Sequence, residues 1–296
     1  MRTVFLGTSE FAAAVLRALA HSSHRPALVV SRPDSRRGRG RLRSPPPVAL
    51  AARELGIELD QPASVNDEAA RARISQSRPD VLCVCAFGAL LRPPLLAQHT
   101  ILNVHPSLLP RWRGAAPIER AIMHGDSRTG VSIMRITAGL DSGPVCLQGT
   151  EAIEAADTYG LLAARLQAIG ARLLVRALDC SPPFSEQDES LASYAEKISA
   201  ADRELDPARP AGELERVVRA LTPHVGARVR LGDGTWLGVV QARVIDDHDH
   251  TPGSVSLQAS TAPVLRCARG SLQLSVVQPP GGRQMSGEDY VRGHRS

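Results

Sequence analysis

Asn103 and His105 lie two residues apart in the stretch NVHPSLLPRWRGAAPI, which spans residues 103–118. The amide of Asn103 donates hydrogen bonds at any pH, and the imidazole of His105 can donate or accept near neutrality. Two such groups suit an oxygen atom that gains negative charge during a reaction, so acyl-type transfer is the natural chemistry for the pair. The chain contains no GxSxG motif, so nothing in the sequence requires a covalent serine intermediate.

Asp141 is the best candidate for a third group that tunes or orients the imidazole. It lies in the motif GLDSGP, and the glycines on either side let a loop approach the site closely. Each of these residues also has a structural interpretation. Asn103 and His105 could be hydrogen-bonded structural residues at a strand end, Asp141 could stabilise a turn, and Trp112 suits packing as well as stacking on a substrate.

The first third of the chain predicts alternating strands and helices. Strands are expected at residues 3–6, 27–30, 57–59, 80–86 and 101–105, and helices at 10–20, 48–55 and 67–76. This pattern predicts an α/β fold with a doubly wound, mostly parallel (Rossmann-like) sheet. Asn103 and His105 then share one face at the carboxyl end of a strand, where ligands bind in such sheets. The first strand–helix turn, GTSEF, lacks the GxGxxG spacing, which disfavours a dinucleotide cofactor.

Later segments predict a second, smaller domain. Strands at residues 130–135 and 145–148 and a long helix at 158–178 close the first domain, and the next residues are polar with scattered prolines. A short helix at 213–221 and several β-type runs after Val225 predict an OB-like β-barrel, a common nucleic-acid-binding module. The predicted organisation is a catalytic domain at residues 1–180, a linker at 181–206 and a barrel domain at 207–296.

The composition is that of an ordinary globular protein, with 43% hydrophobic and 22% charged residues in a chain of 296. No apolar run reaches the roughly 18–20 residues of a membrane-spanning helix, and the first residues do not resemble a signal sequence, so a cytoplasmic protein is expected. The five cysteines show no CxxC spacing, which argues against a zinc site. The motif DDHDH at residues 246–250 resembles metal ligands in composition, but an exposed hairpin loop explains it as well, and no metal is expected.

An arginine-rich loop is expected between the second strand and the second helix. Residues 31–47, SRPDSRRGRGRLRSPPP, contain six arginines and one aspartate, a net charge of +5 that equals the formal net charge of the whole chain. Guanidinium groups pair bidentately with phosphate, and glycines let the backbone conform to a partner. The loop is therefore either a phosphate-contacting device or a solvated loop that only aids solubility, and the loop alone does not decide between the two.

Several motifs together resemble the methionyl-tRNA formyltransferase family. They are the stretch 103–118, GLDSGP downstream of it, GTSEFA at the first turn, RPDSRRGRG and SPPPV after the second strand, SYAEKIS in the linker and QMSGEDY near the end. The resemblance extends from Val4 to Tyr290. Its Asn-x-His, SLLP and Asp core is shared with formyltransferases that act on glycinamide ribonucleotide and on amino sugars. This core therefore indicates the reaction, while the arginine loop and the carboxyl-terminal part indicate the acceptor.

The resemblance implies formyl transfer from 10-formyltetrahydrofolate to the α-amino group of methionyl initiator tRNA, for translation initiation. The family's catalytic trio falls on Asn103, His105 and Asp141, and Asp141 is expected to keep His105 protonated and correctly placed. The family's folate-contacting stretch is SLLP, here Ser107, Leu108, Leu109 and Pro110. The arginine loop corresponds to the insertion that engages the acceptor stem of tRNA, which implies tRNA contacts from Arg36, Arg37, Arg39, Arg41 and Arg43. A monomer that uses no metal is expected.

Three other functions compete with this one. A formyltransferase acting on a small phosphorylated or nucleotide-sugar amine has little need for a loop of charge +5. A hydrolase of the formyl donor would usually carry a regulatory domain in front of the first strand, which here is expected to begin at residue 3. A non-catalytic RNA-binding protein would use the barrel and the loop, but that function leaves Asn103, His105 and Asp141 unexplained.

Overall fold

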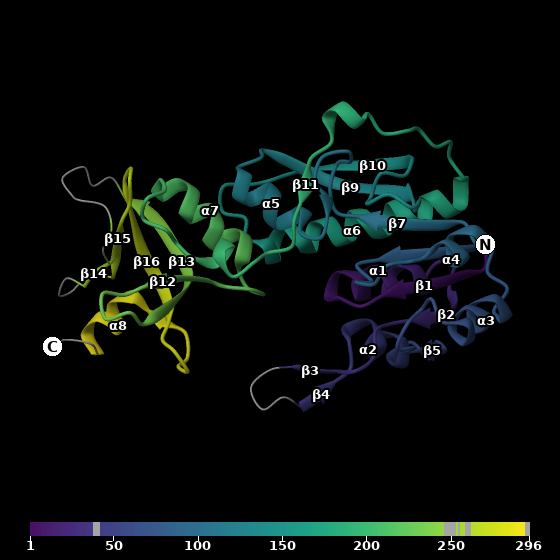
Figure 1. Ribbon diagram of the computed structural model, residues 1–296, viewed down its shortest axis with the longest axis horizontal. Coiled ribbons are helices and arrows are strands. Elements are labelled where there is room, and N and C mark those ends of the chain that lie inside the picture. Colours follow the sequence, from purple (N-terminus) through teal and green to yellow (C-terminus); the bar gives the residue numbers. More distant parts are fainter. Residues whose placement is uncertain (38–41, 246–252, 254, 258–261, 294–296) are drawn as a thin grey trace. The chain divides into compact units, whose positions relative to one another are not determined.

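The structure is a computed structural model that describes residues 1–37, 42–245, 253, 255–257 and 262–293 (Figure 1). The chain folds into two compact units. The first unit contains residues 1–114, 129–152 and 163–194, and the second contains residues 115–128, 153–162 and 195–296. The second unit thus includes two short stretches from the amino-terminal half, whereas the boundaries predicted from the sequence assume continuous domains.

A seven-stranded sheet forms the centre of the first unit (Figure 1). Its strands are β1 (Thr3–Gly7), β2 (Pro26–Val30), β5 (Leu59–Asp60), β6 (Val81–Cys85), β7 (Ile101–His105), β9 (Arg128–Arg135) and β10 (Val145–Ala152). Their order is β10-β9-β7-β6-β1-β2-β5. The neighbouring strands β7, β6, β1, β2 and β5 pair in the parallel direction, and β7 pairs with β9 in the antiparallel direction. The prediction of a mostly parallel α/β sheet is confirmed.

The central strands β1 and β6 are buried along their whole length. Helices cover both faces of a doubly wound sheet, which explains why TVFLG and VLCVC read as continuous apolar runs. Burial raises the pKa of the Cys83 thiol to about 12 and that of Cys85 still higher. These two cysteines pack as small hydrophobic residues, as the sequence predicts.

Local signals place most helices of the first unit correctly. The helices are α1 (Glu10–Ala20), α2 (Pro47–Glu54), α3 (Glu68–Gln76), α4 (Pro93–Gln98) and α6 (Tyr159–Cys180), whose first residues belong to the second unit. The Ser9 side chain accepts a hydrogen bond from the N–H of Ala12 (3.3 Å), which caps α1 as expected. Gly56 follows α2 with φ of +62°, a left-handed conformation that suits glycine. α4 is absent from the predicted set because six residues that begin with two prolines carry no helical period.

Gly170 lets α6 approach the strand that carries the Asn-x-His pair. A Cβ at Gly170 would lie 2.8 Å from Cγ1 of Val104 in β7, so Val104 faces this helix. Side chains alternate between the two faces of a strand. Asn103 and His105 therefore face the opposite side of the sheet from α6.

The arginine-rich segment forms a β-hairpin stem where the sequence suggested only a loop. β3 (Ser35–Arg37) pairs with β4 (Leu42–Ser44) in the antiparallel direction. Nε2 of Gln61 anchors the base of the stem, because it donates to Arg32 O and to Asp34 Oδ1, both at 2.9 Å. Gln61, which directly follows β5, therefore holds the residues just before β3 in place.

The second unit is built on a six-stranded sheet in which every recorded pairing is antiparallel. Its strands are β12 (Ala227–Arg230), β13 (Trp236–Ile245), β14 (Val255–Ser256), β15 (Val264–Arg266), β16 (Ser271–Gln278) and β17 (Met285–Ser286). Their path is β12-β13-β16-β15-β14, with β17 paired to β16. The prediction of a smaller antiparallel β-domain after the α/β domain is confirmed.

Helices α5 (Pro117–His124), α7 (Ala211–Leu221) and α8 (Gly287–Gly293) complete the second unit. Buried residues of α7, including Leu214 and Val218, share one hydrophobic core with Leu237 of β13 and Leu272 of β16. The remaining short elements of the chain are the strands β8 (Arg113–Gly114) and β11 (Tyr194–Ala195), which pair, and the 3₁₀ helices η1 (Glu189–Leu191) and η2 (Ala201–Arg203). No helix within the described ranges is both long and apolar enough to cross a lipid bilayer.

Candidate active site

The strand β7 carries Asn103 and His105 to the carboxyl edge of the parallel sheet. In the strand register Asn103 lies opposite Val84 of β6 and Met134 of β9, and His105 lies opposite Ser132. Asn103 is partly exposed, whereas only 4% of His105 is exposed. The amide is therefore the more accessible of the two polar groups.

Both ring nitrogens of His105 face oxygen atoms of the protein. Nε2 lies 2.9 Å from the carbonyl oxygen of Trp112, and because a carbonyl only accepts, Nε2 carries a hydrogen and donates. Nδ1 lies 3.6 Å from Oδ2 of Asp141, an ion-pair distance that is longer than a direct hydrogen bond. The juxtaposition of Asp141 and His105 expected from the sequence is thus present in the structure.

Asp141 lies on the turn between β9 and β10, in a left-handed backbone conformation with φ of +46°. Its Oδ2 accepts a hydrogen bond from the N–H of Gly114 (2.9 Å). Gly143 on the same turn packs against backbone so closely that a Cβ would lie 1.9 Å from the carbonyl oxygen of Arg135. The glycine after Asp141 therefore permits the close approach that the GLDSGP motif suggested.

The SLLP turn begins at Ser107, two positions after His105, and is held by buried and partly buried hydrogen bonds. The Ser107 hydroxyl donates to Arg111 O (2.7 Å). The Ser132 hydroxyl donates to Ser107 O (2.7 Å) and accepts from the N–H of Leu109 (3.1 Å). Ser107 and Leu109 are buried, while Leu108 and Pro110 are partly exposed. Only Leu108 and Pro110 therefore offer much side-chain surface to a ligand.

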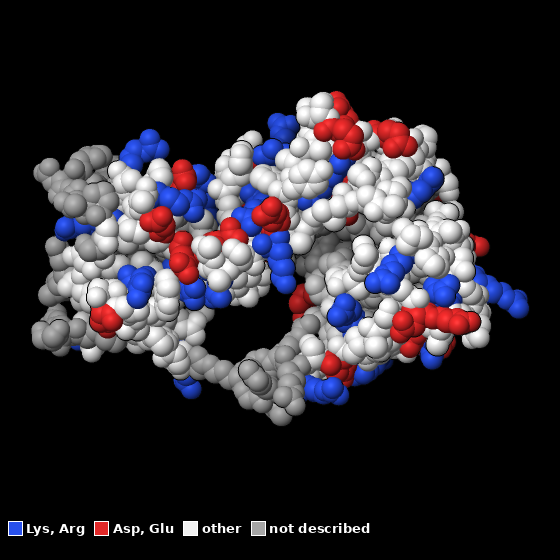
Figure 2. Space-filling model, viewed as in Figure 1, with Lys and Arg blue, Asp and Glu red and all other residues white. Residues whose placement is uncertain are grey.

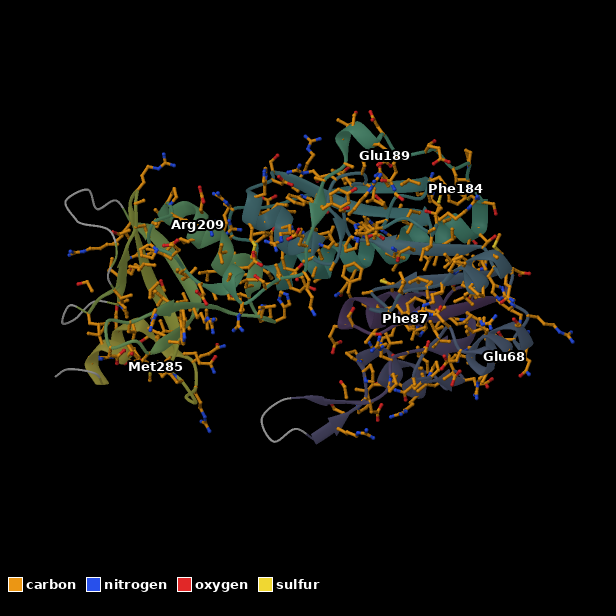
Figure 3. All side chains as sticks on the ribbon, viewed as in Figure 1. Glu68, Phe87, Phe184, Glu189, Arg209 and Met285 are labelled. Atoms are coloured by element: carbon orange, nitrogen blue, oxygen red, sulfur yellow. The ribbon has the colours of Figure 1, made fainter. Side chains whose placement is uncertain are left out.

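The loops after β1 and β6 meet at the same edge of the sheet. The Thr8 hydroxyl donates to the carbonyl oxygen of Phe87 (2.7 Å), which is labelled in Figure 3. The strand order reverses between β1 and β6, because β2 continues on one side of β1 and β6 on the other. Ligands of doubly wound sheets bind at such a reversal, beside the carboxyl ends of the strands.

The arginine hairpin follows β2, whose carboxyl end lies at this same edge. Arg36 and Arg37 belong to β3, and Arg43 is an exposed residue of β4. Arg39 and Arg41 lie outside the described residues, so the structure does not place them. The stem register sets Arg36 opposite Arg43.

Sequence reasoning missed Arg113, Gln187, Glu189 and Ser132, which support the candidate trio. Arg113 is 1% exposed, and its guanidinium contacts both Gln187 and Glu189. The WRG stretch next to SLLP was a usable signal for Arg113. Nothing distinguishes Gln187 within PPFSEQDES, which reads as a surface linker.

Within the described ranges, no group of three or more His, Cys, Asp and Glu residues has the arrangement of a metal site. The DDHDH motif at residues 246–250 lies outside those ranges. The candidate site itself presents an amide, an imidazole and a carboxylate.

Comparisons with known proteins cover nearly the whole chain. The family model described as "Formyl transferase" matches residues 1–178, and that described as "Formyl transferase, C-terminal domain" matches residues 197–295. A methionyl-tRNA formyltransferase of Methylococcus capsulatus is 42% identical over 304 positions, which cover 99% of this chain and 97% of the relative. An enzyme of the same name from Stenotrophomonas maltophilia is 40% identical, with 100% of this chain and 98% of the relative covered.

Two solved structures share the fold at low sequence identity. HypX from Aquifex aeolicus in complex with tetrahydrofolic acid superposes with a TM-score of 0.68 at 15% identity, over 98% of this chain and 47% of that chain. An N-formyltransferase from Helicobacter canadensis, in complex with folinic acid and dTDP-3-aminofucose, gives a TM-score of 0.67 at 12% identity, over 93% and 99%. At these identities the similarity concerns the fold alone.

Proposed function

This chain belongs to the methionyl-tRNA formyltransferase family, and from that premise we propose that it transfers the formyl group of 10-formyltetrahydrofolate to the free α-amino group of methionyl initiator tRNA. The product serves translation initiation, so the enzyme acts in the cytoplasm. The observation that carries the proposal is the distance of 3.6 Å between His105 Nδ1 and Asp141 Oδ2, with His105 on the strand that also carries the partly exposed Asn103.

The α-amino group of methionyl-tRNA needs no strong base to act as the nucleophile. An α-amino group titrates near roughly 7.7–8.0 in reference peptides, and esterification of the neighbouring carboxyl lowers this value, so the amine is largely neutral at physiological pH. The amine nitrogen forms a bond to the formyl carbon, whose oxygen becomes an oxyanion. The bond between that carbon and the folate nitrogen then breaks, and the proton lost by the amine ends on the folate nitrogen.

Asn103 and His105 have separate roles toward the oxyanion. Asn103, the less buried residue of the pair, donates from its amide. Nε2 of His105 is committed to Trp112 O, so the imidazole acts through Nδ1. In the proposed step the protonated imidazole donates from Nδ1 to the oxyanion, and the Asp141 carboxylate, 3.6 Å from Nδ1, balances the charge of that form. Water held by Asp141 and His105 relays the proton to the folate nitrogen.

The folate contacts are assigned to the SLLP turn. Leu108 and Pro110 supply the surface that touches the folate, and Ser107 and Leu109 shape the turn from inside. This assignment rests on the family motif and on the position of the turn, which begins two residues after His105.

The tRNA contacts are assigned to Arg36, Arg37, Arg39, Arg41 and Arg43. Residues 31–47 concentrate a net charge of +5 in this segment. Such a charge attracts a polyanion such as the acceptor stem of tRNA, which supports a binding role for the hairpin over a purely solubilising one. All proposed site residues come from one chain, and the active form is proposed to be a monomer.

Incubation of the protein with 10-formyltetrahydrofolate and three candidate acceptors tests this function. The acceptors are methionyl initiator tRNA, methionyl elongator tRNA and an amino sugar, and the measurement is which amine carries formyl. Formylation of the initiator tRNA well above the other two is expected. Preferential formylation of the amino sugar, or release of formate without any acceptor, would replace the proposed function by a rival.

A further inference from the structure

We propose that Gln187 is a positioning residue for formyl transfer, which holds the turn bearing Asp141 in place and is itself held by Arg113. This inference rests on the proposed function, because Asp141 matters only if the His105–Asp141 pair acts in the reaction. Gln187 does not touch the reacting atoms; it acts through Asp141.

The turn that carries Asp141 needs external support. Residues 137–140 before Asp141 are all exposed, and Asp141 itself has the left-handed φ of +46°. This conformation is uncommon for a residue with a side chain, although Asp adopts it more readily than most, and contacts with the surrounding structure stabilise it. Gln187 provides such contacts, because its Nε2 donates to Asp141 O (2.8 Å) and to Gly143 O (2.7 Å).

The amide of Gln187 has one possible orientation. Its Oε1 accepts from Nε (3.0 Å) and Nη2 (2.9 Å) of Arg113. A guanidinium only donates and a carbonyl only accepts, so exchanging the oxygen and nitrogen of this amide would break all four hydrogen bonds. Gln187 therefore links the buried guanidinium of Arg113 to the turn, so that the position of the guanidinium fixes the position of the turn.

Arg113 keeps one position because its charged guanidinium is buried and must stay paired. A buried guanidinium is strongly destabilising unless it is paired, and Arg113 donates from Nη1 and Nη2 to the two carboxylate oxygens of Glu189, both at 2.8 Å. Glu189, labelled in Figure 3, has 68% of its side chain exposed. Glu186, Asp188 and Glu189 of this segment are all exposed. Acidic side chains gather near the top of the face drawn in Figure 2. The hydrogen bond with Glu189 raises the pKa of Arg113 above its ordinary value.

The same segment also fixes the partner of His105. The N–H of Trp112 donates to Ser193 Oγ (3.0 Å), and the N–H of Arg113 donates to Ser193 O (2.8 Å). Trp112 O accepts from Nε2 of His105, and the N–H of Gly114 donates to Asp141 Oδ2. Residues 112–114 thus hydrogen-bond to both His105 and the carboxylate of Asp141. Gln187 hydrogen-bonds to the backbone carbonyl of Asp141.

The test compares Gln187→Ala, Gln187→Glu and the control Glu186→Ala in steady-state formylation of methionyl initiator tRNA. Gln187→Glu keeps an acceptor for Arg113 but cannot donate to Asp141 O and Gly143 O. For both Gln187 variants, kcat is expected to fall roughly 10-fold to 100-fold while KM for each substrate stays within about 2-fold, since displacement of a catalytic group by about 1 Å has this order of effect. Gln187→Glu is expected to melt below wild type but nearer to it than Gln187→Ala, because it keeps the acceptor for Arg113, and Glu186→Ala is expected to match wild type in every respect.

A double variant decides whether Gln187 acts through Asp141. In an Asp141→Asn background, Gln187→Ala should lower kcat by less than about 2-fold, because the group that it positions is already impaired. A full additional loss in that background, or wild-type kcat in Gln187→Glu, would overturn the positioning role. If wild type does not formylate methionyl-tRNA, the proposed function itself fails, which is a different result from either of these.

Discussion

At the residue scale, the two donors of β7 differ in how the protein holds them. His105 is almost fully buried, and its Nε2 is hydrogen-bonded to a backbone carbonyl. Asn103 is partly exposed in the same strand. The burial of His105 suits a group that must keep one orientation, and the exposure of Asn103 suits a group that touches the substrate directly.

Replacing Asn103 tests the direct donor. Asn103→Ala should lower kcat by roughly 10²–10³, the usual effect of losing one oxyanion donor, because the amide acts on charge that develops only in the transition state. The dissociation constant of the folate should change by less than about 3-fold in equilibrium titration. Asn103→Asp is the size-matched variant, and it should be at least as impaired because a carboxylate repels an oxyanion. Wild-type turnover in Asn103→Ala would remove Asn103 from the site.

Replacing Asp141 by Asn tests the charge of the carboxylate separately from its place in the fold. The amide can still accept the hydrogen bond that Gly114 donates to Oδ2, so the turn should keep its structure. Loss of the negative charge beside His105 should lower kcat by at least about 10-fold, with folate affinity nearly unchanged. Single-turnover formylation and folate titration give the two numbers. Turnover equal to wild type would mean that the 3.6 Å pair has only a structural role.

At the element scale, the arginine hairpin is expected to act through phosphate contacts. Substitution of Arg36, Arg37, Arg39, Arg41 and Arg43 by Ala should weaken tRNA binding and leave folate affinity unchanged. Each lost contact with a duplex phosphate lowers the magnitude of the slope of log K against log salt by about 0.9, so loss of five contacts should lower that magnitude by up to about 4.5. Binding measured between about 50 and 200 mM salt gives the slope.

Arg73→Ala is the matched control for the hairpin variant. Arg73 lies on α3, outside the hairpin, and pairs with Glu58 on the surface. Its removal should leave both tRNA affinity and the salt slope as in wild type. An unchanged slope in the five-fold hairpin variant would indicate that the hairpin serves only solubility.

The two buried cysteines of β6 are expected to react slowly with thiol reagents. Because burial raises the pKa of Cys83 and Cys85 and no solvent reaches them, they should resist alkylation by iodoacetamide in the native protein. Cys180 is exposed and should react first. Mass spectrometry of peptides after a short exposure at pH 8 measures the order. Early modification of Cys83 would show that the sheet opens far more readily than its burial indicates.

The elements that could be predicted from the sequence are those defined by local signals. β7 at residues 101–105 and α1 at residues 10–20 have the expected bounds, because apolar runs, caps and glycines are local features. The hairpin pairing of β3 and β4 was not predicted, since short polar strands carry no hydrophobic alternation. The role of Gln187 was not predictable either, because its partners lie 44 to 74 positions away and the polar stretch around it reads as linker.

At the scale of the whole molecule, the two units differ in which candidate site residues they contain and in which family model they match. The first unit contains every residue of the candidate trio, the SLLP turn and the described part of the hairpin. The second unit contains the antiparallel sheet that lies within the match to the carboxyl-terminal formyltransferase domain. Two segments of the amino-terminal half, 115–128 and 153–162, also belong to it. Its stability therefore depends on contacts between positions far apart in the chain.

One such contact joins Arg120 to Asp202 within the second unit. Nη1 and Nη2 of Arg120 donate to the two carboxylate oxygens of Asp202 at 2.7 and 3.1 Å, and the N–H of Ser199 donates to Oδ2 at 2.8 Å. These hydrogen bonds, that of Arg120 foremost, lower the pKa of Asp202 from its ordinary value of 3.8 to about 2. The shift corresponds to about 2 kcal/mol of stability, because one pKa unit is equivalent to about 1.4 kcal/mol.

The pH dependence of this contribution follows from the direction of the shift. A carboxyl whose pKa is lower in the folded state stabilises the protein fully above the unfolded-state value and loses that contribution as pH falls through the folded-state value. Asp202→Asn should therefore destabilise the second unit by about 2 kcal/mol near neutral pH, and the difference from wild type should shrink between about pH 4 and pH 2. Urea unfolding in a Trp112→Phe background gives the measurement, because Trp236 then reports from the second unit alone. A difference that stays constant down to about pH 2 would show that the ionisation of Asp202 does not account for the lost stability.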